Sequence, residues 1–135
     1  MSSKRLLGCL RKRDFLNSDR GDPPQLVQLG TRYLDEGRIS DAIDFFEKAH
    51  HRERLESILE RCLDDGDFFL YRRVARILGF SPGPDQWTKL GDRSLFLGKL
   101  HFAYSAYREA GVPEKLMQVE RRLSEERLAD KVHVP

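Results

Sequence analysis

The sequence has few of the residues that usually mark covalent or metal chemistry. Only two of its 135 residues are cysteines, Cys9 and Cys62, and their spacing fits neither a zinc site nor a disulfide framework. No glycine-rich phosphate loop and no nucleophile elbow is present. We therefore expect two free thiols in a reducing, cytoplasmic compartment, with a disulfide as the lesser alternative. We also expect no catalytic residue, no metal and no cofactor, and hence no enzyme.

Long apolar runs and a strong charge of one sign are missing too. No stretch of about 18 apolar residues exists, so we expect no membrane span. The N-terminus has neither a sustained apolar core nor a small-residue cleavage site, which predicts no signal peptide. A net charge of +2 and a pI near 8.6 are too mild to require nucleic acid as a partner. An apolar content of 39% is low for a compact globule and suits an elongated helical array.

Two groups of side chains could suggest a ligand site, but both have a simpler interpretation. His50 and His51 are adjacent, with Glu53 close behind. On a helix, adjacent side chains point about 100° apart, so we interpret the two histidines as cations near a helix C-terminus. A set of aromatic residues with helical spacing is interpreted as core, with Trp87 as an anchor: Phe45, Phe46, Trp87, Phe102, Tyr104 and Tyr107.

Apolar residues at helical spacing form two stripes within residues 26–49. The first stripe holds Leu26, Leu29, Gly30 and Tyr33, and after Gly37 the second holds Ile39, Ala42, Ile43, Phe46 and Ala49. Two such stripes joined by a short turn predict an antiparallel helical hairpin. The pattern returns around Gly66 and again around Gly98, at intervals of about 30 residues, which is typical of a helical solenoid.

The first and third hairpins resemble tetratricopeptide repeats. The first unit matches that family throughout, at Leu26, Leu29, Gly30, Tyr33, Gly37, Ala42, Phe46 and Ala49. The third unit departs at Ser94, where an aromatic residue is usual, and matches at Trp87, Leu90, Gly91, Gly98, Ala103, Tyr107 and Ala110. The middle unit departs at Leu59 and Tyr71, and Arg54 stands where a closing proline is usual. The resemblance covers about residues 24–112. It implies an all-α fold, a right-handed α-solenoid of three antiparallel helical hairpins with a C-terminal capping helix.

One repeat domain is expected, between a basic segment and a short tail. Residues 1–21 are a basic arm or a short helix, and its cations include Lys4, Arg5, Arg11, Lys12 and Arg13. Residues 22–130 form the repeat domain. It includes a capping helix over 113–130 whose narrow apolar stripe is Leu116, Val119 and Leu123. Residues 131–135 are expected to fray. We expect no sheet and about seven helices, with an eighth near residues 6–13 as the alternative to a frayed arm. The seven are predicted over about 22–36, 40–51, 54–65, 67–78, 85–97, 99–110 and 113–129.

The resemblance implies that a partner peptide or protein binds in a concave groove lined by the first helix of each hairpin. Carried over to this sequence, the groove residues are Val27, Thr31, Leu34, Glu53, Glu56, Glu60, Leu63, Asp85, Thr88, Asp92 and Leu95. This set holds carboxylates and no base, so we expect a basic, partly apolar partner segment. The bases with which one branch of the family grips a C-terminal carboxylate are missing from the matching positions. The chain is therefore expected to be a non-enzymatic scaffold or adaptor.

Two other functions stay open. The basic arm, together with arginines such as Arg72, Arg73 and Arg76, could bind nucleic acid or an anionic surface. Nucleic acid is the disfavoured partner because the net charge is mild. The terminal hairpins could instead stack between chains, which would make the protein a self-associating structural subunit. We expect a monomer or a weak homo-oligomer.

Overall fold

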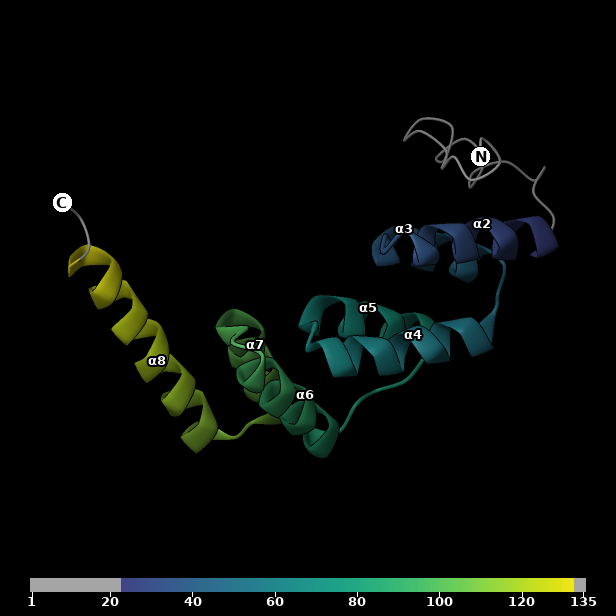
Figure 1. Ribbon diagram of the computed structural model, residues 1–135. Coiled ribbons are helices and arrows are strands. Elements are labelled where there is room, and N and C mark those ends of the chain that lie inside the picture. Colours follow the sequence, from purple (N-terminus) through teal and green to yellow (C-terminus); the bar gives the residue numbers. More distant parts are fainter. Residues whose placement is uncertain (1–22, 133–135) are drawn as a thin grey trace. The chain divides into compact units, whose positions relative to one another are not determined.

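The computed structural model describes residues 23–132, and within them the chain is entirely helical (Figure 1). Seven helices are present in this part: α2 Pro23–Asp35, α3 Ile39–Lys48, α4 Arg52–Asp65, α5 Phe68–Leu78, α6 Pro84–Phe96, α7 Leu100–Ala110 and α8 Pro113–Val132. The all-α prediction is confirmed for these residues. The basic arm with its alternative helix, and the last residues of the expected tail, lie outside the described residues.

The six connections between these helices share one backbone conformation and hydrogen-bonding pattern. Each contains a residue with positive φ, and the following amide donates to the carbonyl five positions earlier, as in Asp67 N to Cys62 O at 2.9 Å. This is the Schellman arrangement, which normally requires glycine because its left-handed conformation disfavours a Cβ. Five connections use glycine, but the sixth uses His50, with φ of 55°.

His50 is also the residue at which the sequence prediction of a helix end was wrong. We expected one helix to continue to His51, but α3 ends at Lys48, and the His51 amide donates to Phe46 O at 3.0 Å across the turn. The two histidines therefore lie in a connection and not on a helix. The other predicted ends lie within two residues of the observed ones, except that α8 runs to Val132, beyond the expected end near Ala129.

The described residues divide into two compact units, and the boundary along the chain falls within α4, after Ile58. The first contains α2, α3 and the start of α4. Its core forms where α2 lies so close to α3 that a Cβ on Gly30 would be 2.8 Å from the Phe46 ring. Tyr33 stacks on Phe45 with a centroid distance of 5.2 Å, and both are fully buried. Gly30, Tyr33 and Phe46 belong to the two stripes that the sequence predicts, whereas Phe45 lies outside the second stripe and extends the core.

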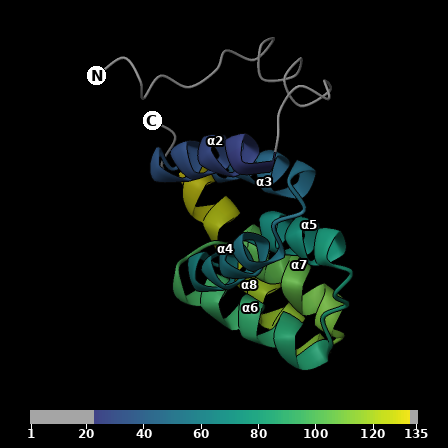
Figure 2. The same cartoon turned by 90° about the vertical axis from the view of Figure 1, so that its right-hand side faces the viewer.

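The second unit contains the end of α4 and the helices α5 to α8 (Figure 2). Here α6 and α7 repeat the same close approach, because a Cβ on Gly91 would lie 2.4 Å from the Tyr107 ring. Trp87 is 7% exposed and lies against Phe68 and Tyr71, at centroid distances of 5.4 and 5.6 Å. The prediction of Trp87 as a core residue is confirmed.

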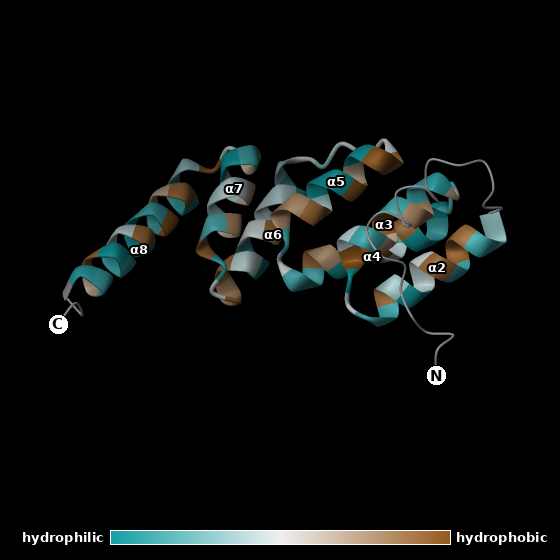
Figure 3. Cartoon of the chain, turned by 90° about the horizontal axis from the view of Figure 1, so that it is seen from above, coloured by the Kyte–Doolittle hydropathy of each residue, from teal (hydrophilic) through white to brown (hydrophobic). Residues whose placement is uncertain are grey.

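The last helix packs on α7 through a narrow stripe, as its sequence predicts. Val119 is fully buried in a cluster with Leu100, Ala103 and Tyr107, and Leu116 and Leu123 lie partly buried against that cluster. Figure 3 shows α8 as mainly hydrophilic, with separate hydrophobic residues along it. A helix of this kind can cover the end of a helical stack with a polar outer face.

Candidate interaction site at the end of α4 and on α6

Three donors from α6 and the turn after it meet the C-terminal end of α4. Arg93 Nε donates to Asp64 O at 2.7 Å, and Lys99 Nζ donates to Asp65 O. The last carbonyls of a helix lack intrahelical donors and carry the negative end of the helix dipole. Two cations therefore satisfy carbonyl groups that would otherwise depend on solvent. Together these contacts fix the end of α4 against α6 within the second unit.

Ser94 supplies the third donor and explains why this position is small. Its side chain is fully buried, and Oγ lies 2.8 Å from Gly66 O and 2.9 Å from Leu90 O. A Cβ added to Gly66 would lie only 2.9 Å from Ser94 Cα, so the two backbones are close to contact. An aromatic side chain, which the repeat resemblance leads one to expect here, has no room. The residue at position 94 is therefore small because the turn after α4 approaches α6 so closely.

A pocket of about 360 Å³ lies beside this junction. It is lined by residues of α4 and α6, namely Leu63, Asp64, Lys89, Asp92, Arg93 and Phe96. Phe96 is 79% exposed, which is unusual for so large an apolar side chain. The Arg93 guanidinium carbon lies 5.4 Å from the centroid of its ring. Since Arg93 Nε also donates to Asp64 O, two contacts hold its guanidinium beside the pocket.

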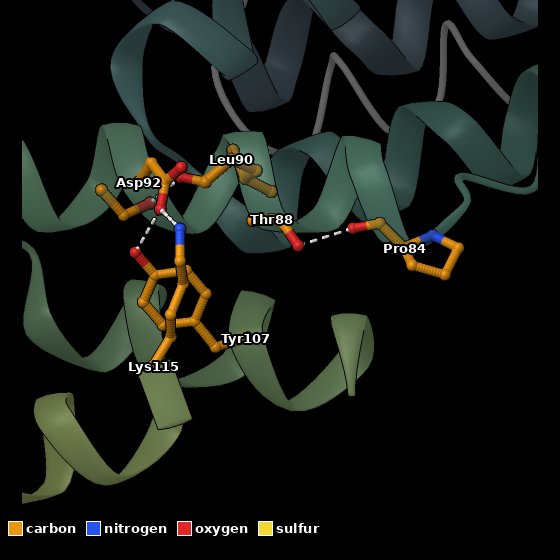
Figure 4. Close-up of polar contacts among 7 residues, drawn as sticks. Pro84, Thr88, Leu90, Asp92, Tyr107 and Lys115 are labelled. Atoms are coloured by element: carbon orange, nitrogen blue, oxygen red, sulfur yellow. Dashed lines mark hydrogen bonds and ion pairs between the residues drawn. The ribbon is translucent and has the colours of Figure 1, made fainter. Parts of the chain in front are cut away.

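The Asp92 carboxylate at the rim of this pocket is already engaged (Figure 4). Its Oδ1 accepts from Tyr107 Oη at 2.6 Å and from Lys115 Nζ at 2.8 Å, so one carboxylate joins α6, α7 and α8. Burial opposes the ionisation of Asp92, but these two hydrogen bonds and the Lys115 charge outweigh it and hold the pKa below its ordinary value. Burial and the same hydrogen bond raise the pKa of Tyr107. The Asp92 carboxylate is therefore favoured in its ionised form and is paired with Lys115.

The structure brings together only part of the predicted groove. Leu63 and Asp92 line the pocket, and Glu60 and Asp85 are exposed on α4 and α6 of the same unit. Leu95 instead packs, partly buried, against the cluster between α7 and α8. It is therefore a core residue more than a groove residue, because the stripe that faces α7 is wider than the sequence pattern shows.

Other predicted groove residues make local contacts within their own helix. Thr31 Oγ1 donates to Val27 O at 2.8 Å, and Thr88 Oγ1 donates to Pro84 O at the same distance (Figure 4). Glu56 pairs with Arg52 Nε at 3.0 Å, so this carboxylate is not an isolated negative charge. Val27, Leu34 and Glu53 lie on α2 and the start of α4, in the first unit. A single groove that includes both sets remains a prediction.

Four pocket residues were missed from the sequence: Asp64, Lys89, Arg93 and Phe96. The set derived from the resemblance contained no base, whereas the pocket carries two bases and two carboxylates. Phe96 did give a signal, since it is a large apolar residue outside the buried stripe of Trp87, Leu90 and Ser94. An apolar residue outside the stripe at the end of an amphipathic helix is a reason to search for a contact surface.

The remaining sequence interpretations concern the aromatic residues, the cysteines, metal binding and a membrane span. Four of the six aromatic residues assigned to the core are buried, and Phe102 and Tyr104 are partly buried. Cys62 is a buried free thiol, and burial together with Asp67 and Asp65 raises its pKa to about 12. Within residues 23–132 no group of three or more candidate metal ligands occurs. Nor does any helix in that range have the length and apolar character to cross a membrane.

No family model, no curated protein and no solved structure matches this chain.

Proposed function

We propose that the chain is a non-enzymatic interaction scaffold, cytoplasmic as its cysteine usage suggests, that binds a segment of a partner protein at the pocket beside α4 and α6. The observation that carries this proposal is Phe96, a phenyl ring 79% exposed at the mouth of a concave site. Large exposed aromatic residues next to a concavity are typical of protein-binding surfaces. The arrangement of the hairpins as a right-handed solenoid, which the repeat resemblance implies, belongs to this proposal.

The rigidity of the pocket supports the proposal. Arg93, Ser94 and Lys99 attach α6 and its following turn to the end of α4, and Asp92 joins α6 to the next two helices. A surface whose side chains are already ordered loses little conformational entropy when a partner binds. The pocket is therefore built before the partner arrives.

The lining residues define the partner chemistry that fits. Leu63 and Phe96 offer an apolar wall, while Lys89 and Asp64 offer one charge of each sign at the rim. The partly apolar character that we expected of the partner fits this wall. The basic character fits less well, because Asp92 is paired with Lys115 and two bases line the pocket. A partner segment with an apolar anchor and flanking polar groups of both signs suits the site best.

A photo-crosslinker placed in the pocket tests the proposal. p-Benzoylphenylalanine replaces Phe96 in the full chain, and in a matched control it replaces Phe80, which is 38% exposed outside the pocket. After irradiation in cells, crosslinked species are identified by mass spectrometry. We expect one partner protein to be attached through position 96 and absent from the control at position 80.

Other results of this experiment would overturn the proposal. Equal crosslinking from both positions would show that Phe96 is no more than an exposed ring. Crosslinks only to further copies of the chain would favour the self-associating subunit instead. Crosslinks to no protein would leave the basic arm as the better candidate, and loss of heparin retention on deletion of residues 1–21 would then support it.

A further inference from the structure

The helix α5 has an exposed cationic and aromatic side that the pocket does not use. Its sequence, FFLYRRVARIL, contains three arginines and no carboxylate. Phe68, Tyr71, Val74 and Ala75 are buried, whereas Phe69 is 52% exposed and Arg76 is exposed. Exposed phenylalanine on a helix with a well-formed buried stripe is not required by folding.

Arg72 lies over two phenyl rings. Its guanidinium carbon is 5.0 Å from the Phe68 centroid and 5.5 Å from the Phe69 centroid. Both distances are within the range of cation–π attraction, which holds the planar group in place. Within residues 23–132 its guanidinium forms neither an ion pair nor a hydrogen bond. The five N–H donors of a held guanidinium are thus available to an external acceptor.

Phe69 contacts one aromatic ring on its own helix, α5, and another on α7. Its centroid is 5.2 Å from that of Phe68 and 5.6 Å from that of Phe102 on α7, in edge-to-face geometry. Phe102 is itself only partly buried. Two aromatic side chains therefore stand beside a fixed guanidinium, with few rotamers left to lose on binding.

We propose that Phe69, Arg72, Arg76 and Phe102 form a second docking surface, for a protein segment that carries a carboxylate beside an apolar side chain. Charge complementarity selects the acidic partner, because α5 contributes only cations to this surface. A carboxylate can accept two parallel hydrogen bonds from a guanidinium, which gives both strength and orientation. The apolar neighbour covers Phe69 and Phe102. Arginine and aromatic residues are the types most enriched at the centres of protein interfaces.

Single-stranded nucleic acid is the competing acidic partner, and the geometry disfavours it. Nucleic acid would need open ring faces on which several bases could stack, but Phe68 is buried and the Arg72 guanidinium already lies over a face of Phe69. The net charge of the chain, +2, also gives little counterion release. This docking surface belongs to α5 and α7 and is independent of the pocket residues on α4 and α6.

A random library of 12-residue peptides displayed on phage tests the inference. The immobilised full chain captures binders, and those retained by a Phe69→Ser/Arg72→Glu double variant are discarded. We expect the remaining peptides to be enriched in aspartate or glutamate adjacent to phenylalanine, leucine or tryptophan. A synthetic peptide of the enriched sequence should bind at least tenfold more weakly to Arg72→Glu and to Arg76→Glu. It should bind within twofold of wild type to Phe96→Ser, a pocket variant, and to Arg121→Glu, an exposed site on α8.

Further measurements separate binding from folding. Circular dichroism should give the same helicity for every variant, and Arg72→Lys, which keeps the charge without the planar fork, should lose severalfold in affinity. In amide NMR spectra of the full chain, the peptide should shift signals of residues 69, 72 and 102. Enrichment of basic or neutral peptides, or of none, would overturn the inference. So would a Kd unaffected by Arg72→Glu, or tighter binding of a 20-residue oligothymidine that displaces the peptide.

Discussion

Replacing Gly91 by alanine tests the close packing of α6 on α7. A Cβ at this position would lie 2.4 and 2.5 Å from two atoms of the Tyr107 ring, whereas ordinary contact begins at 3.4 Å. The ring would have to retreat by about 1 Å. It has little freedom to do so, because Tyr107 is 1% exposed, its hydroxyl bonds Asp92 at 2.6 Å, and Lys115 Nζ lies 5.6 Å from its centroid.

Two effects of opposite sign decide the magnitude. Overpacking of a core costs about 1–3 kcal/mol, and a rigid ring places this site at the upper end. Alanine in a helix interior is about 1 kcal/mol more favourable than glycine. The free energy of unfolding should therefore fall by about 1–2 kcal/mol in Gly91→Ala. Urea unfolding followed by the fluorescence of Trp87 measures it, since this single tryptophan lies in the same unit.

Two further variants act as controls for this argument. A Cβ on Gly83 would meet only the end of the Gln86 side chain, at 3.0 Å, so Gly83→Ala should change stability by less than about 0.5 kcal/mol. Gly30→Ala, where the Phe46 ring would lie 2.8 Å away, should cost less than Gly91→Ala because the clash is smaller. Unchanged or increased stability of Gly91→Ala would show that the Tyr107 ring can move. The account of the Asp92 junction as a rigid element would then be wrong.

Substitutions at three other positions have defined outcomes. Trp87→Ala should cost roughly 3–5 kcal/mol by thermal unfolding in circular dichroism, as for a buried aromatic, and a loss below about 1 kcal/mol would contradict its burial. Ser94→Ala leaves the Gly66 carbonyl without its hydroxyl donor and should cost about 1–3 kcal/mol, while Ser94→Tyr should cost more because the site has no room. Hydrogen bonds from Lys115 and Tyr107 keep the pKa of Asp92 in the folded protein below its ordinary value of 3.8. The ionised Asp92 therefore stabilises the fold fully above pH 3.8, and this contribution is lost as the pH falls through the folded pKa. The stability difference between wild type and Asp92→Asn should therefore shrink in acid, and a difference that stays constant down to about pH 2 would argue against the contact.

The helices themselves could be predicted because each contains its own signal. Stripes at helical spacing located all seven helices of residues 23–132, and glycine marked five of their six connections. Gly30 and Gly91 hold equivalent places in the two hairpins of the sequence pattern, and each lies against an aromatic ring, Phe46 and Tyr107 respectively. The connection at His50 was misplaced because a histidine in the left-handed region leaves no compositional trace.

The pocket could be predicted only in part because its contacts join residues far apart in the chain. Arg93 and Lys99 meet carbonyl groups 29 and 34 residues earlier, and no local pattern encodes such a contact. A surface lysine or arginine looks the same in the sequence whether it binds a helix end or points into solvent. The one departure that did carry information was Ser94, whose small size reports the close approach of Gly66.

Both proposed binding surfaces depend on arginines held beside exposed phenylalanines. Arg93 lies over Phe96 and donates to a backbone carbonyl, whereas Arg72 lies over Phe68 and Phe69 and donates to no group within residues 23–132. The difference has a consequence for binding. A guanidinium already bonded to a carbonyl can shape a pocket but has fewer donors for a partner. An arginine fixed only by rings keeps its donors free. Neutralising Arg93 should therefore loosen the pocket itself, whereas neutralising Arg72 should remove affinity for a carboxylate and leave the fold unchanged.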